Sequence, residues 1–214
     1  MCEGDPSETQ GDAMISPSVI VGAASMSKRG EIECGDQYLV QITPKRVIAA
    51  VVDGVGHGPE ARHAADLATA TIAQHLESNP ILLVERIHEA LLGSRGAVLS
   101  VAVFNLADET MTWLGVGNVE SVLFRADAKV SPKREVLLLR GGMLGRRVPA
   151  LREATIKVSS GDTLVMATDG VKGTFFIDLN AGGAPQALAE SVLAKHATGT
   201  DDALVLAVRY MGRA

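Results

Sequence analysis

Residues 47–58 read VIAAVVDGVGHG, an unbroken apolar run that leads directly into an acidic, glycine-rich loop. The run at 47–52 predicts a buried strand that ends at Asp53. A carboxylate buried alone costs about 20 kcal/mol by the idealised Born estimate, so Asp53 needs a partner or a metal ion. Three glycines follow within six residues and let the backbone turn tightly and bring its carbonyls close to a ligand.

Two other apolar runs also border aspartates. The run at 163–168 leads into Asp169-Gly170, and Asp201-Asp202 come just before the run at 203–208. Several carboxylates that converge on one point are typical of a site for a hard divalent cation. Each motif also has a simpler interpretation: a local helix cap for Asp53, a plain turn for Asp169-Gly170, and a solvated approach to a strand for Asp201-Asp202.

Five further residues are candidates for the site. Asp36 lies at the head of a predicted strand. It is interpreted equally well as a metal ligand or as a turn residue. Asn118 follows a glycine between two strands, where a turn role with positive φ is the favoured interpretation and a metal-side or phosphate-side role the alternative. His57 has an ordinary pKa of about 6.5, which suits proton transfer, and is otherwise a loop histidine. Lys28 and Arg29 could meet an anionic substrate or simply be solvated.

The composition limits the possible classes of protein. The 214 residues fit one domain, and 47% of them are hydrophobic but only 3% aromatic, so Val, Leu, Ile, Ala and Met must build the core. The net charge of −5 argues against a nucleic-acid partner. No apolar run is long enough to span a membrane, and the start of the chain does not read as a secretory signal. Cys2 and Cys34 make no disulfide framework, which favours a reducing, cytoplasmic setting.

The chain divides into a predicted disordered tail over residues 1–15 and one domain over 16–214. Periodicity predicts helices over 60–77, 81–92 and 185–196. Strands are predicted over 19–24, 37–42, 47–52, 98–105, 111–117, 119–125, 135–139, 154–158, 163–168 and 203–210. Clusters of strands around an internal pair of helices indicate an α+β fold, an αββα sandwich of two mainly antiparallel sheets flanked by helices.

Taken together, the motifs resemble those of the metal-dependent, PPM-type protein serine/threonine phosphatases. The matching elements occur in family order: Gly35-Asp36, Asp53-Gly54 with Gly58, Gly117-Asn118, Asp169-Gly170 and Asp201-Asp202. The chain looks most like the small RsbX-type feedback phosphatases of the stressosome, which are bare catalytic domains. The stretches that carry this closer likeness are Cys34 to Asp36, Asp53 to Gly58, Arg95 to Ala97, Val116 to Val119 and Thr168 to Gly170.

The resemblance implies a centre of two Mn²⁺ or Mg²⁺ ions. In this arrangement Asp53 would bridge both ions and the Gly54 carbonyl would bind one of them. Asp169 and Asp201 would complete the coordination of the second ion, and Asp36 would contact the metal centre through bound water. The implied reaction is hydrolysis of phosphoserine and phosphothreonine by metal-activated water. The implied substrates are phosphorylated stressosome scaffold proteins, and the expected oligomeric state is a monomer.

The sequence departs from the eukaryotic members of this family at two positions. Their histidine directly after Asp-Gly is Val55 here, so His57 does not inherit its acid role by position. Their phosphate-binding arginine aligns with Glu31, so Lys28 or Arg29 could substitute, or water and metal could suffice. Two other functions stay open: a catalytically weak module that binds phosphoproteins, and a phosphatase of small phosphoesters.

Overall fold

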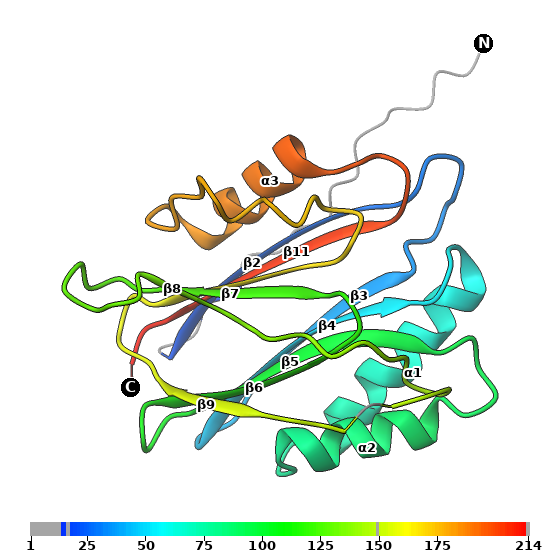
Figure 1. Ribbon diagram of the computed structural model, residues 1–214, viewed down its shortest axis with the longest axis horizontal. Helices are drawn as coiled ribbons and strands as arrows, with labels where there is room; N and C mark the ends of the chain where they lie inside the picture. Colours follow the sequence, from blue (N-terminus) through cyan, green and yellow to red (C-terminus); the bar gives the residue numbers. More distant parts are fainter. Residues whose placement is uncertain (1–13, 16–17, 149, 213–214) are drawn as a thin grey trace.

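The computed structural model describes residues 14–15, 18–148 and 150–212. Their backbone forms two stacked β-sheets with helices on both outer faces (Figure 1). The helices are α1 (Pro59–Gln74), α2 (Pro80–Ala90) and α3 (Pro185–His196). The strands are β1 (Met14–Ile15), β2 (Val19–Met26), β3 (Asp36–Ile42), β4 (Arg46–Gly54), β5 (Ala97–Asn105), β6 (Thr110–Val116), β7 (Glu120–Phe124), β8 (Arg134–Val136), β9 (Ala154–Lys157), β10 (Thr163–Ala167) and β11 (Ala203–Tyr210).

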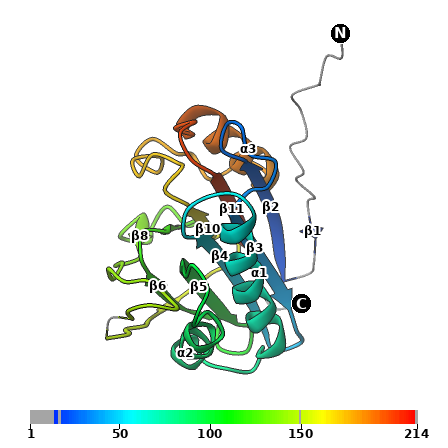
Figure 2. The same cartoon turned by 90° about the vertical axis from the view of Figure 1, so that its right-hand side faces the viewer.

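All strand pairs in the two sheets are antiparallel. The six-stranded sheet has the order β1-β2-β11-β10-β7-β8, and the five-stranded sheet has the order β3-β4-β5-β6-β9. Seen end-on, α3 covers the six-stranded sheet while α1 and α2 cover the other (Figure 2). This is the predicted αββα sandwich, and the α+β fold class is therefore confirmed.

The unbroken apolar run of β4 is explained by burial on both faces. Successive side chains of a strand point to opposite faces of its sheet. Val47, Ala49 and Val51 therefore enter the core between the two sheets. Ile48, Ala50 and Val52 enter a second core under α1 and α2. The strand β11 is buried in the same way, between the first core and a third one under α3.

The helices begin where the sequence provides starting signals. Proline occupies the first turn of each helix, where its missing N–H is not needed. Asn79 caps α2, because its side-chain oxygen accepts a hydrogen bond from the Leu82 N–H at 2.8 Å. Gly58 caps α1 with a φ of 72° and no side-chain hydrogen bond. Asp53 is therefore not the cap of this helix.

The structure differs from the sequence predictions mainly at the ends of elements. Met14–Ile15, which were expected to belong to the tail, form β1 and pair with β2. The rest of the predicted tail lies outside the described residues. The first helix ends at Gln74 instead of residue 77, because the His75 N–H turns back to the Ile72 carbonyl. No helix in the described part of the chain is long and apolar enough to cross a membrane.

Candidate metal centre

The first two aspartates of the site lie side by side at one end of the five-stranded sheet. Asp36 opens β3, and its register partner on β4 is Asp53. Asp36 is buried and accepts a hydrogen bond from the Thr168 hydroxyl at 2.7 Å. Because Thr168 follows β10 of the other sheet, this bond ties the two sheets together at the acidic end.

The six-stranded sheet contributes three more carboxylates at this end. Asp169 follows β10 and is exposed, whereas Asp201 and Asp202 precede β11. Asp202 is only 3% exposed and accepts the backbone N–H groups of Lys28 and Gly35 at 2.7 and 2.8 Å. Asp202 therefore holds the loop between β2 and β3, which the sequence did not reveal. The simpler interpretation of Asp201-Asp202 as a solvated approach to a strand is therefore wrong for Asp202. The adjacent Asp201 is half-buried.

Glycine is required after Asp53 and Asp169 because other backbone segments come too close for a side chain. A Cβ on Gly54 would overlap the carbonyl oxygen of Ala61 in α1. A Cβ on Gly170 would overlap the carbonyl oxygen of Asp202. Both Asp-Gly pairs therefore allow tight packing at the site, and Asp169-Gly170 also form the predicted turn, in which the Val171 N–H donates to the Thr168 carbonyl at 3.0 Å.

Asp36 and Asp53 are the two carboxyl groups whose ionisation is most opposed, by burial and by the neighbouring aspartates. Burial first, and then the charges of Asp36, Asp169, Asp201 and Asp202, raise the pKa of Asp53 to about 9. The pKa of Asp36 is raised to about 7, chiefly by burial and by the charges of Asp202, Asp169 and Asp201, against the lowering effect of the Thr168 hydrogen bond. Ionised oxygens held together without a counter-charge suit a divalent cation, so the donor set fits hard metal ions such as Mn²⁺ or Mg²⁺.

Within the described ranges, no three His, Cys, Asp or Glu side chains already form a compact group around one point. The fit to a metal ion therefore rests on the chemistry of the donors and on the raised pKa values. The ligand assignments made from the sequence for Asp36, Asp53, Gly54, Asp169 and Asp201 stay predictions.

His57 lies on the exposed loop that follows Asp53. Its Nδ1 is 2.6 Å from the Oε1 of Glu31. Since a carboxylate oxygen can only accept, the Nδ1–H donates and leaves Nε2 free. Glu31 was not predicted as a partner of His57. The two residues are 26 positions apart in the sequence, and no sequence signal indicates their contact.

Of the three residues predicted to bind substrate, Asn118, Lys28 and Arg29, only Asn118 has a side-chain contact with one of the aspartates in the described part of the chain. Asn118 Nδ2 donates to Asp169 Oδ2 at 2.7 Å, so this side chain does border the acidic end. It also lies in the predicted bend between β6 and β7, where the positive φ of 99° belongs to Gly117 and Asn118 itself has none. Lys28 contributes its backbone N–H to Asp202, and Arg29 is exposed. No ion pair is recorded for either within the described residues.

Comparison with known proteins identifies the family and the fold. Residues 43–211 match the family model described as Stage II sporulation protein E (SpoIIE), which is more than half of the chain. The chain therefore belongs to the SpoIIE family. Its two-sheet architecture is also that of solved PPM serine/threonine phosphatases, including one from Mycobacterium smegmatis with a TM-score of 0.66 at 17% identity over 89% of this chain and 97% of that one. The chain thus shares the fold of the PPM phosphatases.

Three relatives are particularly informative. Phosphoserine phosphatase RsbX of Bacillus subtilis is 26% identical over 148 residues, which cover 68% of this chain and 71% of RsbX. A chain from a structural study of the bacterial stressosome is 27% identical, covers 89% of this chain and 99% of its own length, and has a TM-score of 0.81. The crystal structure of RsbX in complex with magnesium also has a TM-score of 0.81, at 20% identity, over 94% of this chain and 100% of that one. The predicted closeness to RsbX is therefore confirmed.

Proposed function

We propose that this protein hydrolyses phosphoserine and phosphothreonine in proteins, with a water molecule activated by two divalent metal ions. The observation that carries the proposal is the convergence of carboxylates from both sheets at one end of the sandwich, with the pKa of Asp53 raised to about 9 and that of Asp36 to about 7. Such a cluster is unfavourable by itself and favourable around cations. The likeness to RsbX, a phosphoserine phosphatase, supports the proposed reaction.

Asp36, Asp53, the Gly54 carbonyl, Asp169 and Asp201 would hold the ions, which we expect to be Mn²⁺ or Mg²⁺. Once bound, such ions supply a water acidic enough to attack phosphorus near neutral pH, and positive charge to offset the phosphoryl oxygens. Asp202 and Thr168 position these ligands. Asp202 holds the β2–β3 loop by accepting two backbone N–H groups, and the Thr168 hydroxyl donates to the Asp36 carboxylate. Asn118 holds Asp169 through its side-chain amide.

His57 is the proposed proton donor to the leaving alkoxide. The Glu31 carboxylate fixes the His57 ring by accepting from Nδ1, so Nε2 is the atom that would carry the transferred proton. Lys28 and Arg29 are the substrate-side cations proposed from the sequence.

A cysteine nucleophile is not required. Cys34 lies next to the site, but burial, followed by the charge of Asp36, raises the pKa of its thiol to about 12. A thiol of this kind stays protonated at neutral pH and is a poor nucleophile. Direct attack by water is therefore the reaction that the described residues favour.

The proposed substrates are phosphorylated scaffold proteins of a stressosome, acted on in the cytoplasm by a monomeric enzyme. Support comes from the 27% identity to a chain from a structural study of the bacterial stressosome and from the likeness to RsbX. The residues that border the site agree with a protein substrate: Asp169, Asn118 and His57 are all exposed, so a phosphorylated loop could reach them.

The decisive experiment incubates the protein with phosphorylated stressosome scaffold proteins, with and without Mn²⁺, and follows phosphate loss by mass spectrometry. Mn²⁺-dependent dephosphorylation that is absent in Asp53→Asn is expected. Binding of the phosphoprotein without turnover would instead identify a binding module. Turnover of p-nitrophenyl phosphate alone would identify a phosphatase of small phosphoesters.

A further inference from the structure

Arg95 is held against the acidic loop by its own backbone neighbours. It lies between α2 and β5, one residue before Gly96, whose carbonyl accepts the Val55 N–H at 3.0 Å. The next residue, Ala97, is the register partner of Gly54. The segment that carries Arg95 is therefore hydrogen-bonded to the loop that follows Asp53.

The guanidinium of Arg95 lies over Gly56 of this loop. A Cβ placed on Gly56 would be only 2.7 Å from Arg95 Nη1, and the φ of 96° at Gly56 also disfavours a side chain there. The other side of the loop carries negative charge, because Glu31 contacts His57 and lies 2.9 Å from a Cβ placed on Gly58. Arg95 thus brings the positive charge to a loop with acidic groups around it.

Most of the hydrogen-bonding capacity of Arg95 is unused. Its Nε pairs with the Oε2 of Glu60, and the two side chains are 48% and 69% exposed. Glu60 is its only recorded partner in the described part of the chain. A guanidinium has five N–H donors in a planar fork, so several remain for a ligand. Arg146 donates to the neighbouring Ser94 carbonyl at 3.2 Å and adds positive charge nearby.

We propose that Arg95 binds the phosphoryl group of the substrate. A phosphate dianion that approaches five aspartates is repelled, and Glu31 beside the loop adds a further negative charge. An arginine fork matches phosphate oxygens with two parallel hydrogen bonds. This assignment rests on the proposed function, since it concerns the same phosphoester.

The test uses the full chain loaded with Mn²⁺ and compares Arg95→Ala, Arg95→Lys and Glu60→Gln. The readouts are KM and kcat for a phosphoserine peptide and the inhibition constant of inorganic phosphate. We expect Arg95→Ala to raise KM and the phosphate inhibition constant roughly 10- to 100-fold, as for a lost charged hydrogen bond, with a smaller effect on kcat. Arg95→Lys should keep the charge, lose the fork and give an intermediate value.

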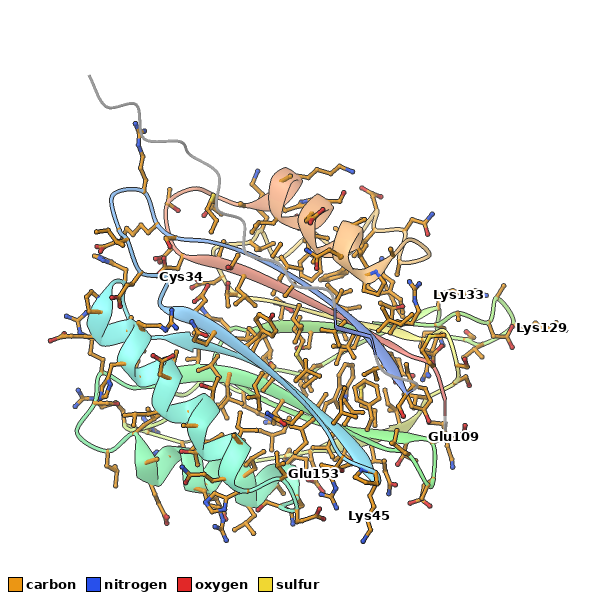
Figure 3. The ribbon with its side chains drawn as sticks, turned by 180° about the vertical axis from the view of Figure 1, so that it is seen from behind. Cys34, Lys45, Glu109, Lys129, Lys133 and Glu153 are labelled. Carbon is orange, nitrogen blue, oxygen red and sulfur yellow. The ribbon has the colours of Figure 1, made fainter. Side chains whose placement is uncertain are left out.

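Glu60→Gln separates phosphate binding from a structural role. If Arg95 binds phosphate, freeing it from Glu60 leaves phosphate binding unchanged or tighter. If Arg95 only braces α1 against β5, both variants lose kcat and thermal stability together while the phosphate inhibition constant stays the same, and the proposal is overturned. Lys129→Ala, at the end of the sandwich opposite Cys34 (Figure 3), is the charge control and should behave as wild type.

Failure of the proposed function can be told apart from failure of this assignment. A wild-type protein without Mn²⁺-dependent phosphate release would contradict the proposed function whatever Arg95 does. Calorimetric titration of inorganic phosphate into the Mn²⁺-loaded wild type and Arg95→Lys then still tests Arg95. Equal phosphate affinity in the two proteins would overturn the assignment, and it can be measured even if Arg95→Ala does not fold.

Discussion

Asp53 is the residue whose charge is least favourable in the metal-free protein, because burial and four neighbouring aspartates all oppose its ionisation. Asp53→Asn should lower phosphatase activity roughly 100-fold or more, since it removes a charged ligand from the proposed metal centre. The same change should raise the melting temperature of the metal-free protein, since it removes a buried carboxyl group that must take up a proton when the chain folds at neutral pH. Steady-state kinetics at saturating Mn²⁺ and calorimetry in EDTA measure the two effects.

Asp108→Asn is the matched control for this prediction. Asp108 is an exposed aspartate between β5 and β6 that accepts a hydrogen bond from Asn105. Its neutralisation should change neither activity nor metal dependence. Full activity of Asp53→Asn at saturating Mn²⁺ would contradict the assignment of the centre.

His57 is the residue at which the proton transfer can be tested. His57→Ala should slow hydrolysis of a phosphoserine peptide by about 10²–10⁴-fold, the usual contribution of general acid catalysis. Hydrolysis of p-nitrophenyl phosphate should slow far less, because nitrophenolate leaves without a proton. The ratio of the two kcat values is the measurement. Equal, small losses on both substrates would instead make His57 a loop residue.

At the scale of elements, the approach of α1 to the end of β4 positions the acidic loop. Gly54→Ala places a methyl group against the Ala61 carbonyl of α1, so the helix or the loop must move. We expect a loss of stability of about 1–3 kcal/mol, as for an overpacked site, and a large loss of Mn²⁺ affinity. Chemical denaturation and metal titration measure these effects.

Gly183→Ala provides the comparison for this change. A Cβ at Gly183 meets nothing within 4 Å, and its backbone has no positive φ. Its substitution should therefore leave both stability and Mn²⁺ affinity nearly unchanged. If Gly54→Ala were equally harmless, close packing of α1 would not be what positions the metal ligands.

At the scale of the whole molecule, the raised pKa values link folding to pH. The pKa of Asp53 is raised to about 9 and that of Asp36 to about 7, well above the ordinary pKa of an aspartate, so the folded metal-free protein binds more protons than the unfolded chain between about pH 4 and pH 9. Its free energy of unfolding must therefore fall as the pH rises through this window. Added Mn²⁺ competes with these protons and should stabilise the fold more at pH 8 than at pH 5.

Melting temperatures at several pH values, in EDTA and in Mn²⁺, test this linkage. Other titrating groups contribute to the slope, so the difference between wild type and Asp53→Asn is the relevant quantity. The variant should show a flatter dependence on pH in EDTA. Identical slopes for the two proteins would mean that the acidic end does not control the pH dependence of folding.

The sequence alone determined most of the elements and the type of site, because their signals are local. The apolar run at 47–52 predicts a strand buried on both faces, and β4 is buried in this way between two cores. Prolines and asparagine mark the helix starts within one turn. The acidic ends of the strands then point to a cation site, since a buried carboxylate needs a counter-charge whatever the fold.

Only the tertiary structure decided how the side chains at the site are paired. Asp202 reaches Gly35 across 167 residues, Asn118 reaches Asp169 across 51, and His57 meets Glu31 across 26. These contacts join loops from different elements, so no periodicity or spacing in the sequence encodes them. They depend on how the two sheets stack and on how closely α1 packs, and this packing also places Arg95 over the acidic loop.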